Sequence, residues 1–286
     1  MTPRILDFDG GVLPLAGEDR IDLAEWQEAI RFGCSLTALD ALERHLGDLL
    51  DDGRPLFVGS GDFHHVSFLR LRRMAGTEHR LRVVVLDNHP DNMRYPFGIH
   101  CGSWVAHASR LSGVARIDVL GISSADVAGW HALENRLSPL RSGKVYYWCL
   151  RRPLGVLQRL GAKGVQSFDT PAELLAAFAT TLDERALYLS IDKDVLAPDV
   201  VRTNWDQGSF GAADLAAAIR LVAPRLVGSD VVGEASAYRY RSLGKRLLSR
   251  LDGQSMLPTD ELARWQRGQR EINCQILESL AGSCSR

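Results

Sequence analysis

Histidines and aspartates gather directly after three short apolar runs of the sequence. The first run leads into VGSGDFHHVS, the second into VVVLDNHPDN and the third into YLSIDKDV. Imidazole nitrogens and carboxylate oxygens carry protons and bind divalent cations, so such a group predicts a metal site or acid–base chemistry. The side chains concerned are His64, Asp87, His89, Asp91, Asp192 and Asp194.

The spacing within these segments predicts that the side chains converge. In extended chain the side chains alternate between two faces, so Asp87, His89 and Asp91 share one face. Asp192 and Asp194 share a face by the same rule. Carboxylates that meet in one place repel one another unless cations lie between them. This oxygen-rich set with two histidines favours a pair of ions such as Mn²⁺ over a thiolate zinc site.

Short β-rich runs carry these residues and alternate with segments of helical periodicity. Nearly continuous apolar runs such as VVVLD and YLSID are typical of strands buried on both faces of a parallel sheet. Ligands bind outside the carboxyl ends of the strands in such sheets. We therefore predict that residues 1–286 form a single α/β domain, with helices on both faces of a mainly parallel sheet. The predicted strands are 56–59, 82–87, 115–122, 145–150, 164–168, 186–192 and 226–232.

Three helices are predicted from apolar spacing and from signals at their ends. Residues 171–183 have Thr170 as a cap and Pro171 at the first helical position, followed by leucines and alanines at helical spacing. Residues 212–222 form a second helix, which is followed by Pro224. The tail that begins at residue 259 is amphipathic and predicts a final helix.

Composition favours an ordinary soluble protein over several other classes. The chain has 286 residues, of which 45% are hydrophobic and 24% charged, enough for a core that needs no structural disulfide or metal. A formal net charge of -1 provides no general attraction for nucleic acid or for a membrane surface. Five scattered cysteines without a C-x-x-C pair, and an amino terminus without an apolar leader, predict a reducing, cytoplasmic location.

The motifs resemble those of the arginase, agmatinase and formiminoglutamase family of ureohydrolases. GDFHHVS is similar to the family's G-G-D-H-S, DNHPD to D-A-H-x-D, and SIDKD to S-x-D-x-D. DVVGE is similar to the segment that ends in the substrate-binding glutamate, and all four motifs occur in the family's order between Gly61 and Glu234. The resemblance implies a three-layer arginase-like fold and a hydrolase with two Mn²⁺ ions per chain.

By resemblance, the six side chains divide between the two ions. A one-residue shift of GDFHHVS would exchange His64 for His65, and the alignment without a gap favours His64. The implied ligands are His64 and Asp91 for the first ion, His89 and Asp194 for the second, and Asp87 and Asp192 as bridges.

The resemblance also implies a reaction on a small cationic substrate. A hydroxide shared by two cations about 3.5 to 4 Å apart would attack the carbon of a guanidinium or formimino group. Asp91 would pass the proton to the leaving amine, and Glu234 would pair with the substrate cation. The implied proton shuttle is His100 or its neighbour Cys101, in the loop NMRYPFGIHCGSW.

Departures from the family's pattern leave the substrate open. The family continues x-x-D-P after the residue equivalent to Asp194, whereas Val195, Leu196, Ala197 and Pro198 follow here, so a supporting aspartate is missing. The loop 92–104 has no counterpart of the residues that read the α-amino and α-carboxylate groups of arginine. We therefore expect another guanidino or formimino compound to be preferred. Assembly into a homo-oligomer is also left open.

Two other functions are compatible with parts of the sequence. ILDFDGGV matches the D-x-D-G core of haloacid-dehalogenase-type phosphatases, with Asp7 as nucleophile and Asp9 as acid. That family has Thr or Val where Gly11 stands, and the simpler interpretation is a strand followed by a turn at Gly10 and Gly11. The other alternative is a catalytically silent protein of the arginase fold that acts by binding. Retention of all six ligand positions argues for an enzyme.

Overall fold

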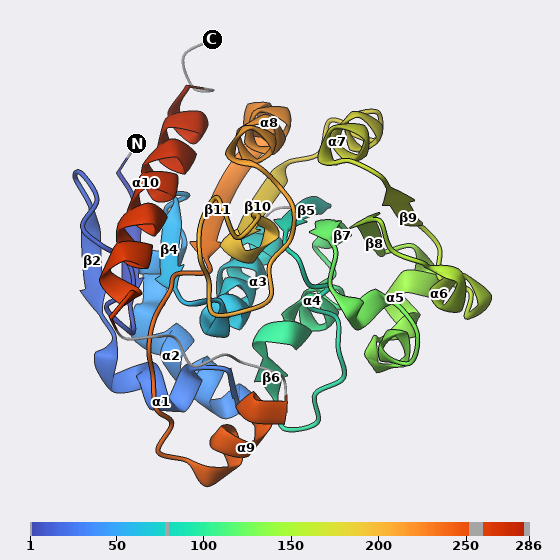
Figure 1. The fold of residues 1–286 in the computed structure, drawn as a ribbon. Coiled ribbons are helices and arrows are strands. Elements are labelled where there is room, and N and C mark those ends of the chain that lie inside the picture. The colour runs from blue at the N-terminus through green and yellow to red at the C-terminus, as the bar shows by residue number, and fades with distance from the viewer. Residues whose placement is uncertain (1, 78–79, 252–259, 283–286) are drawn as a thin grey trace.

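A nine-stranded sheet forms the centre of the molecule, as the computed structural model of residues 2–77, 80–251 and 260–282 shows (Figure 1). The strand order is β2-β1-β4-β11-β10-β5-β7-β8-β9, and every neighbouring pair is parallel. The predicted α/β class and parallel sheet are therefore confirmed. The strands are β1 (Arg4–Asp7), β2 (Asp19–Asp22), β4 (Leu56–Gly59), β5 (Leu81–Leu86), β7 (Val114–Ile122), β8 (Val145–Leu150), β9 (Val165–Phe168), β10 (Leu187–Asp192) and β11 (Leu226–Val232).

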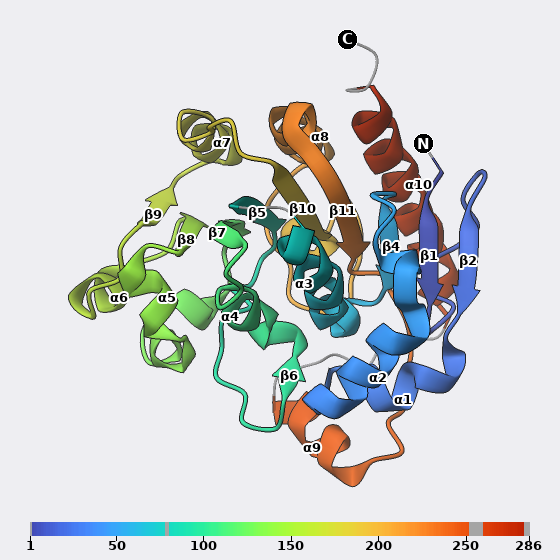
Figure 2. The same cartoon turned by 180° about the vertical axis from the view of Figure 1, so that it is seen from behind.

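Helices cover both faces of this sheet, which gives three layers (Figure 2). One face packs against α2 (Leu36–Leu46), α3 (Ser67–Thr77), α4 (Trp104–Ala108), α5 (Leu137–Ser142) and α6 (Gly155–Arg159). The other face packs against α7 (Pro171–Ala179), α8 (Ala212–Val222) and α10 (Leu262–Ala281). Two further helices, α1 (Gln27–Ile30) and α9 (Leu243–Leu251), lie in the lower part of Figure 1. So does a two-residue antiparallel pair, β3 (Gly33–Cys34) with β6 (Ile99–His100).

The two helical layers explain why the strands are mostly apolar. In β5, Leu81, Val83 and Val85 belong to the core under α2 to α6, whereas Val84 and Leu86 belong to the core under α7, α8 and α10. Burying a side chain of this size stabilises the fold by roughly 1.5–3 kcal/mol. The polar residue of this strand, Arg82, is buried against a partner of opposite charge, Asp118, at 2.8 Å.

Most predicted elements occur with small shifts at their ends, and the departures have local causes. The predicted helix 171–183 ends at Ala179, and its start is held by a capping box between Thr170 and Glu173. Edge strand β2 was missed because its four residues, DRID, are mostly half-buried and lack an apolar run. Residue 259, where the final helix was expected to begin, lies outside the described residues.

The order of the strands brings segments distant in sequence to one edge of the sheet. Strand β11 lies between β4 and β10, and β10 pairs with β5 on its other side. The segments that follow β4, β5 and β10 therefore meet at the carboxyl edge. None of the described helices combines the length and the apolar composition needed to cross a bilayer.

Candidate metal centre and active-site cavity

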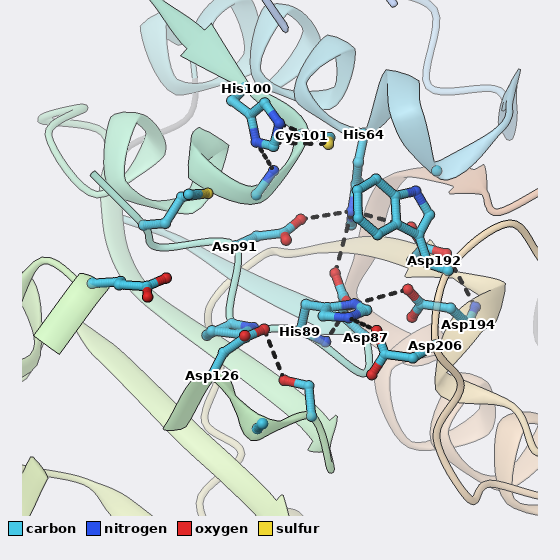
Figure 3. Close-up of a pocket in the computed structure, with 18 of the residues that line it drawn as sticks. His64, Asp87, His89, Asp91, His100, Cys101, Asp126, Asp192, Asp194 and Asp206 are labelled. Atoms are coloured by element: carbon cyan, nitrogen blue, oxygen red, sulfur yellow. Dashed lines mark hydrogen bonds and ion pairs between the residues drawn. The ribbon is translucent and has the colours of Figure 1, made fainter. Parts of the chain in front are cut away.

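All six predicted ligand side chains line one cavity at the carboxyl edge of the sheet (Figure 3). The cavity has a volume of about 450 Å³. Within it, ligand atoms of two overlapping groups lie within 4.8 Å of one another, and Asp87 belongs to both groups. The first group is His64, Asp87 and Asp192, and the second is Asp87, His89 and Asp194.

His64 reaches the cavity from the 3-10 turn Gly61–Val66 that follows β4. Its Nδ1 lies 2.9 Å from Asp91 Oδ2, 3.2 Å from Asp87 Oδ2 and 3.5 Å from Asp192 Oδ2. Burial lowers the pKa of His64, but the neighbouring carboxylates outweigh burial and raise that pKa well above its usual value. One ring nitrogen therefore faces three carboxylates, which is an arrangement that a cation can occupy.

A hydrogen-bond chain behind His64 fixes which ring nitrogen carries the proton. The Nε2 of His64 lies 2.9 Å from Ser190 Oγ, and that hydroxyl donates to Asp230 Oδ1 at 2.7 Å. Because a hydroxyl has one proton, Ser190 accepts from His64 Nε2. In the neutral form of the ring, Nδ1 therefore has a lone pair that faces the cavity. Ser190 lies two residues before Asp192 on β10, so strand alternation is the signal that could have found it.

The neighbouring His65 lies outside the cavity lining. Its side chain is fully buried, and burial lowers the pKa of its ring well below the usual value. The structure therefore brings His64, rather than His65, to the carboxylates.

The segment after β5 reaches the cluster in a way that strand alternation does not explain. The strand ends at Leu86, and Asp91 has a left-handed backbone with φ of 45°. Trp104 donates from Nε1 to Asp91 Oδ2 at 2.7 Å, and Val105 donates from its backbone to Asp91 O at 3.0 Å. These contacts with α4 hold a backbone conformation that is uncommon outside glycine.

His89 is held between two carboxylates. Its Nδ1 lies 2.9 Å from Asp194 Oδ2, and its Nε2 lies 2.7 Å from Asp206 Oδ1. Asn88 also donates to Asp206, at 3.1 Å. Asp206 was not predicted, because it comes from a loop beyond the D-x-D motif and no spacing rule connects it with His89. Asp206 contacts His89 in a chain that has Ala197 where the family's x-x-D-P pattern has its aspartate.

The electrostatics of the protein atoms fit a cation site. Burial and the nearby Asp87 raise the pKa of Asp91 to about 7 and the pKa of Asp192 to about 6. Burial, and then the charges of Asp192 and Asp87, raise the pKa of Asp194 well above its usual value. Asp87 Oδ2 is buried and accepts no hydrogen bond. A divalent ion would satisfy such a buried carboxylate oxygen, which has no donor and lies among further carboxylates.

The outer part of the cavity is acidic as well. Asp126 and Glu134 line it, together with the exposed Asp206, and no Lys or Arg is among the described lining residues. Asp126 accepts a hydrogen bond from Ser124, and Glu134 lies 3.1 Å from His131. This wall therefore favours a cationic molecule and offers no counterion to an anionic one.

His100 and Cys101 line another part of the wall (Figure 3). Gly102 donates its backbone N–H to His100 Nδ1 at 3.0 Å, so the proton of the neutral ring is on Nε2. Burial lowers the pKa of His100 to about 4. Cys101 Sγ lies 3.7 Å from the His100 ring nitrogens.

The structure does not bring Glu234 to the cavity, which corrects the expectation that it pairs with a substrate cation. Its side chain is 2% exposed, and Lys193 Nζ lies 2.6 Å from Glu234 Oε1. Asn273 of α10 donates to the same oxygen at 2.7 Å. The cation that Glu234 meets is therefore a lysine of the chain itself.

Asp7 and Asp9 hold the turn after β1 and do not line the cavity. Asp7 accepts from the backbone of Gly10 at 2.8 Å, and Asp9 accepts from the backbone of Gly11 at 2.9 Å. Asp9 also forms a buried ion pair with Arg31. The strand-and-turn interpretation of ILDFDGG fits this placement, and the phosphatase interpretation does not.

The fold and the cluster together define a three-layer α/β protein with a candidate dinuclear metal centre at the carboxyl edge of its sheet. Solved structures of arginases and related hydrolases have the same architecture. The chain therefore has the arginase-like fold that its motifs imply. No protein-family model matches the chain, and no curated protein matches its sequence.

The similar structures are distant in sequence. Proclavaminate amidino hydrolase from Streptomyces clavuligerus shares 18% identity at a TM-score of 0.56, with 99% of this chain and 92% of that chain covered. Agmatine ureohydrolase of Thermoplasma volcanium shares 14% identity at a TM-score of 0.57, with 98% of this chain and 89% of that chain covered. Formimidoylglutamase from Bacillus subtilis shares 14% identity at a TM-score of 0.56, with 98% of this chain and 86% of that chain covered. At such identities the likeness establishes the fold.

Proposed function

We propose that the chain is a metal-dependent hydrolase that cleaves a C–N bond of a guanidino or formimino substrate. The observation that carries the proposal is the convergence of four carboxylates and two imidazoles at one edge of the sheet. The names of the similar structures, an amidino hydrolase, a ureohydrolase and a formimidoylglutamase, support the same class of reaction.

The proposed metal centre holds two Mn²⁺ ions per chain. Mixed oxygen and imidazole ligands without thiolates suit manganese. Asp87 is the first candidate for a bridge, because it belongs to both groups of ligand atoms. The proposed ligands are His64, Asp87, His89, Asp91, Asp192 and Asp194.

The chain's own residues have distinct tasks in this proposal. The metal pair would supply water that is acidic enough to lose a proton near neutral pH. Asp91, held by Trp104, would move that proton to the leaving amine. His100 would relay protons between the cavity wall and solvent. Asp126 and Glu134, in place of Glu234, would attract the substrate cation to the cavity.

The test combines metal analysis with a substrate screen. Protein purified without chelator is loaded with Mn²⁺, and its metal content is measured. Guanidino compounds are then screened for urea release and formimino compounds for formamide release. We expect two ions per chain and turnover of at least one compound, with both lost in Asp87→Ala. Arg264→Ala, at a surface position on α10, serves as the matched control. Two bound ions without turnover of any amidine would instead identify a catalytically silent binding protein.

We further propose that residues 1–286 form one domain and that the protein works in the cytoplasm. One continuous sheet links β2 to β9, and its two cores run along both faces. Cys34, Cys101, Cys149 and Cys274 form no disulfide within the described ranges, which is compatible with a reducing compartment.

A further inference from the structure

A second cavity lies beside the candidate metal centre and is lined by basic residues. It has a volume of about 610 Å³ and lies between α4, α5 and the segments next to them. Ser109, Ser138 and Ser142 add hydroxyl groups to its wall. No carboxylate is among the described lining residues, and the cationic ones are Arg94, Arg110, Arg136, Arg141 and Lys144.

These positive charges are not neutralised within the described part of the chain, where none of the five forms an ion pair. Two of them are anchored to backbone carbonyls: Arg141 donates to Leu160 O at 2.7 Å and Lys144 to Leu111 O at 2.8 Å. The guanidinium groups of the other three have no hydrogen-bond partner among the described residues. Their donors are therefore available to a ligand.

The repulsion among these groups is visible in their pKa values. Burial, and then the charges of Arg110 and Arg94, lower the pKa of Arg136. Burial lowers the pKa of the nearby His107 too, with Arg110 and Arg136 adding to the effect. An anion bound among these charges would relieve the repulsion and so stabilise the folded state.

The basic cavity is separate from the acidic one, although the two share a wall. Met93 and Asn135 form an antiparallel bridge, and both line the acidic cavity. The next residues along these two segments, Arg94 and Arg136, line the basic cavity. Successive residues of extended chain point to opposite sides, so one wall presents opposite charges to the two cavities.

We propose that this basic cavity binds a small polyvalent oxyanion of the diphosphate or triphosphate type. Arginine forms paired hydrogen bonds to phosphate oxygens, and serine hydroxyls add neutral donors. A small molecule is favoured over a nucleic acid, because the cations are gathered in one concavity and the whole chain carries a net charge of only -1. The inference does not depend on the hydrolase activity.

The test is calorimetric titration of the full chain with sodium pyrophosphate at constant ionic strength. We expect saturable binding, with Arg136→Gln and Arg110→Gln each weakening the affinity about tenfold or more. Arg264→Gln, an exposed arginine on α10, is the matched control and should bind like the wild type. Pyrophosphate also chelates metals, so a loss of affinity supports the proposal only if it occurs in the cavity variants and not in Arg264→Gln.

Titration with adenosine diphosphate is a second arm of the test. An affinity equal to that of pyrophosphate shows recognition of the phosphates alone, and tighter binding shows that the nucleoside contributes.

Thermal unfolding supplies an independent readout. Pyrophosphate should raise the melting temperature of the wild type and of Arg264→Gln, and at the same concentration it should raise that of Arg136→Gln by less. Arg94→Gln, at an exposed position, provides a cavity variant whose folding is not at risk. Absence of pyrophosphate binding, its survival in an Arg110→Gln/Arg136→Gln variant, or tighter binding of a short DNA duplex than of pyrophosphate would each overturn the proposal.

Discussion

Each imidazole of the candidate centre is oriented by a partner on its outer nitrogen. Ser190 holds His64 Nε2, and Asp206 holds His89 Nε2, so both Nδ1 atoms face the carboxylates. Such partners fix the ring orientation of metal-binding histidines and commonly change metal affinity when they are removed. At the scale of single residues, the candidate centre therefore depends on side chains that lie behind the proposed ligands.

Removal of Asp206 should weaken the ion bound at His89. We expect Asp206→Ala to lower the affinity for one Mn²⁺ by roughly ten- to a hundredfold, because His89 loses the acceptor that orients it. Titration calorimetry with Mn²⁺ measures this affinity. Asp126→Ala, which removes another carboxylate of the cavity wall, is the control. An equal loss in both variants would mean that only the total negative charge matters.

Replacing Asp87 and replacing His64 should lower the metal content of the protein by different amounts. Asp87 belongs to both groups of ligand atoms, whereas His64 belongs to one. We expect Asp87→Ala to empty both positions and His64→Ala to retain close to one ion per chain. Elemental analysis after manganese loading measures the content. Two ions remaining in Asp87→Ala would show that it bridges nothing.

His100 should make the metal-free protein less stable in acid. Its folded pKa is about 4, and an unfolded histidine has a pKa of about 6.5. Between these values the unfolded chain binds more protons, so the contribution is present above about pH 6.5 and is lost as the pH falls toward 4. The loss is roughly 3 kcal/mol. Urea unfolding at pH 7.0 and 4.5 should show a smaller pH difference for His100→Asn than for the wild type; equal differences would contradict this.

Helix α10 is tied to the end of β10 by a buried polar cluster. Lys193 stands between Asp192 and Asp194. Its ammonium group contacts Glu234, which follows β11, and also Asn273, which lies on α10. Gln269 of α10 donates to Gly233 O at 2.8 Å. At the scale of elements, these contacts connect the segment that carries two candidate ligands with the last helix of the chain.

Breaking the Lys193–Glu234 pair should destabilise the fold. Lys193→Met leaves the Glu234 carboxylate buried without its cation, which typically costs about 3–5 kcal/mol. Urea unfolding measures the loss. Lys193→Met/Glu234→Leu should recover a large part of it, because no unpaired charge remains. Glu234→Gln should likewise lower stability, and an effect on turnover without a change in unfolding free energy would contradict this assignment.

The near-neutral chain separates its charges into an acidic and a basic cavity. The net charge is -1, yet the described lining of the first cavity has no Lys or Arg and that of the second has no carboxylate. At the scale of the whole molecule, the overall charge therefore conceals two local fields of opposite sign. The local fields decide which small molecules each cavity attracts.

The acidic cavity should discriminate against substrates that carry a carboxylate. An anionic group beside the outer wall, at Asp126 and Glu134, would lose water and gain no Lys or Arg side chain as a partner. We expect kcat/KM for a guanidine with a distal amine or a neutral tail to exceed that for L-arginine by about tenfold or more. A Glu134→Gln variant should reduce the preference for an amine-bearing substrate. Efficient turnover of L-arginine, with other guanidines ignored, would contradict the expectation.

Local sequence determined the parallel strands and the candidate ligand set. Strands β4, β5 and β10 are buried on both faces, so most of their residues are apolar. The few polar residues within them have buried partners, as Ser190 has in His64, and the candidate ligands follow where each strand ends. The carboxyl ends of parallel strands share one edge of the sheet. The motifs HH, DNHPD and DKD, which follow these three strands, could therefore be predicted to meet without knowledge of the strand order.

Tertiary structure alone decided which partners these residues have. The left-handed backbone of Asp91 depends on its contacts with α4, and the support of His89 comes from Asp206 in a later loop. Glu234 pairs with Lys193 because β11 lies beside β10 in the sheet. The basic cavity likewise joins residues from several segments. Contacts of this kind depend on the order and packing of elements, which neither the period of a strand nor the spacing of a motif contains.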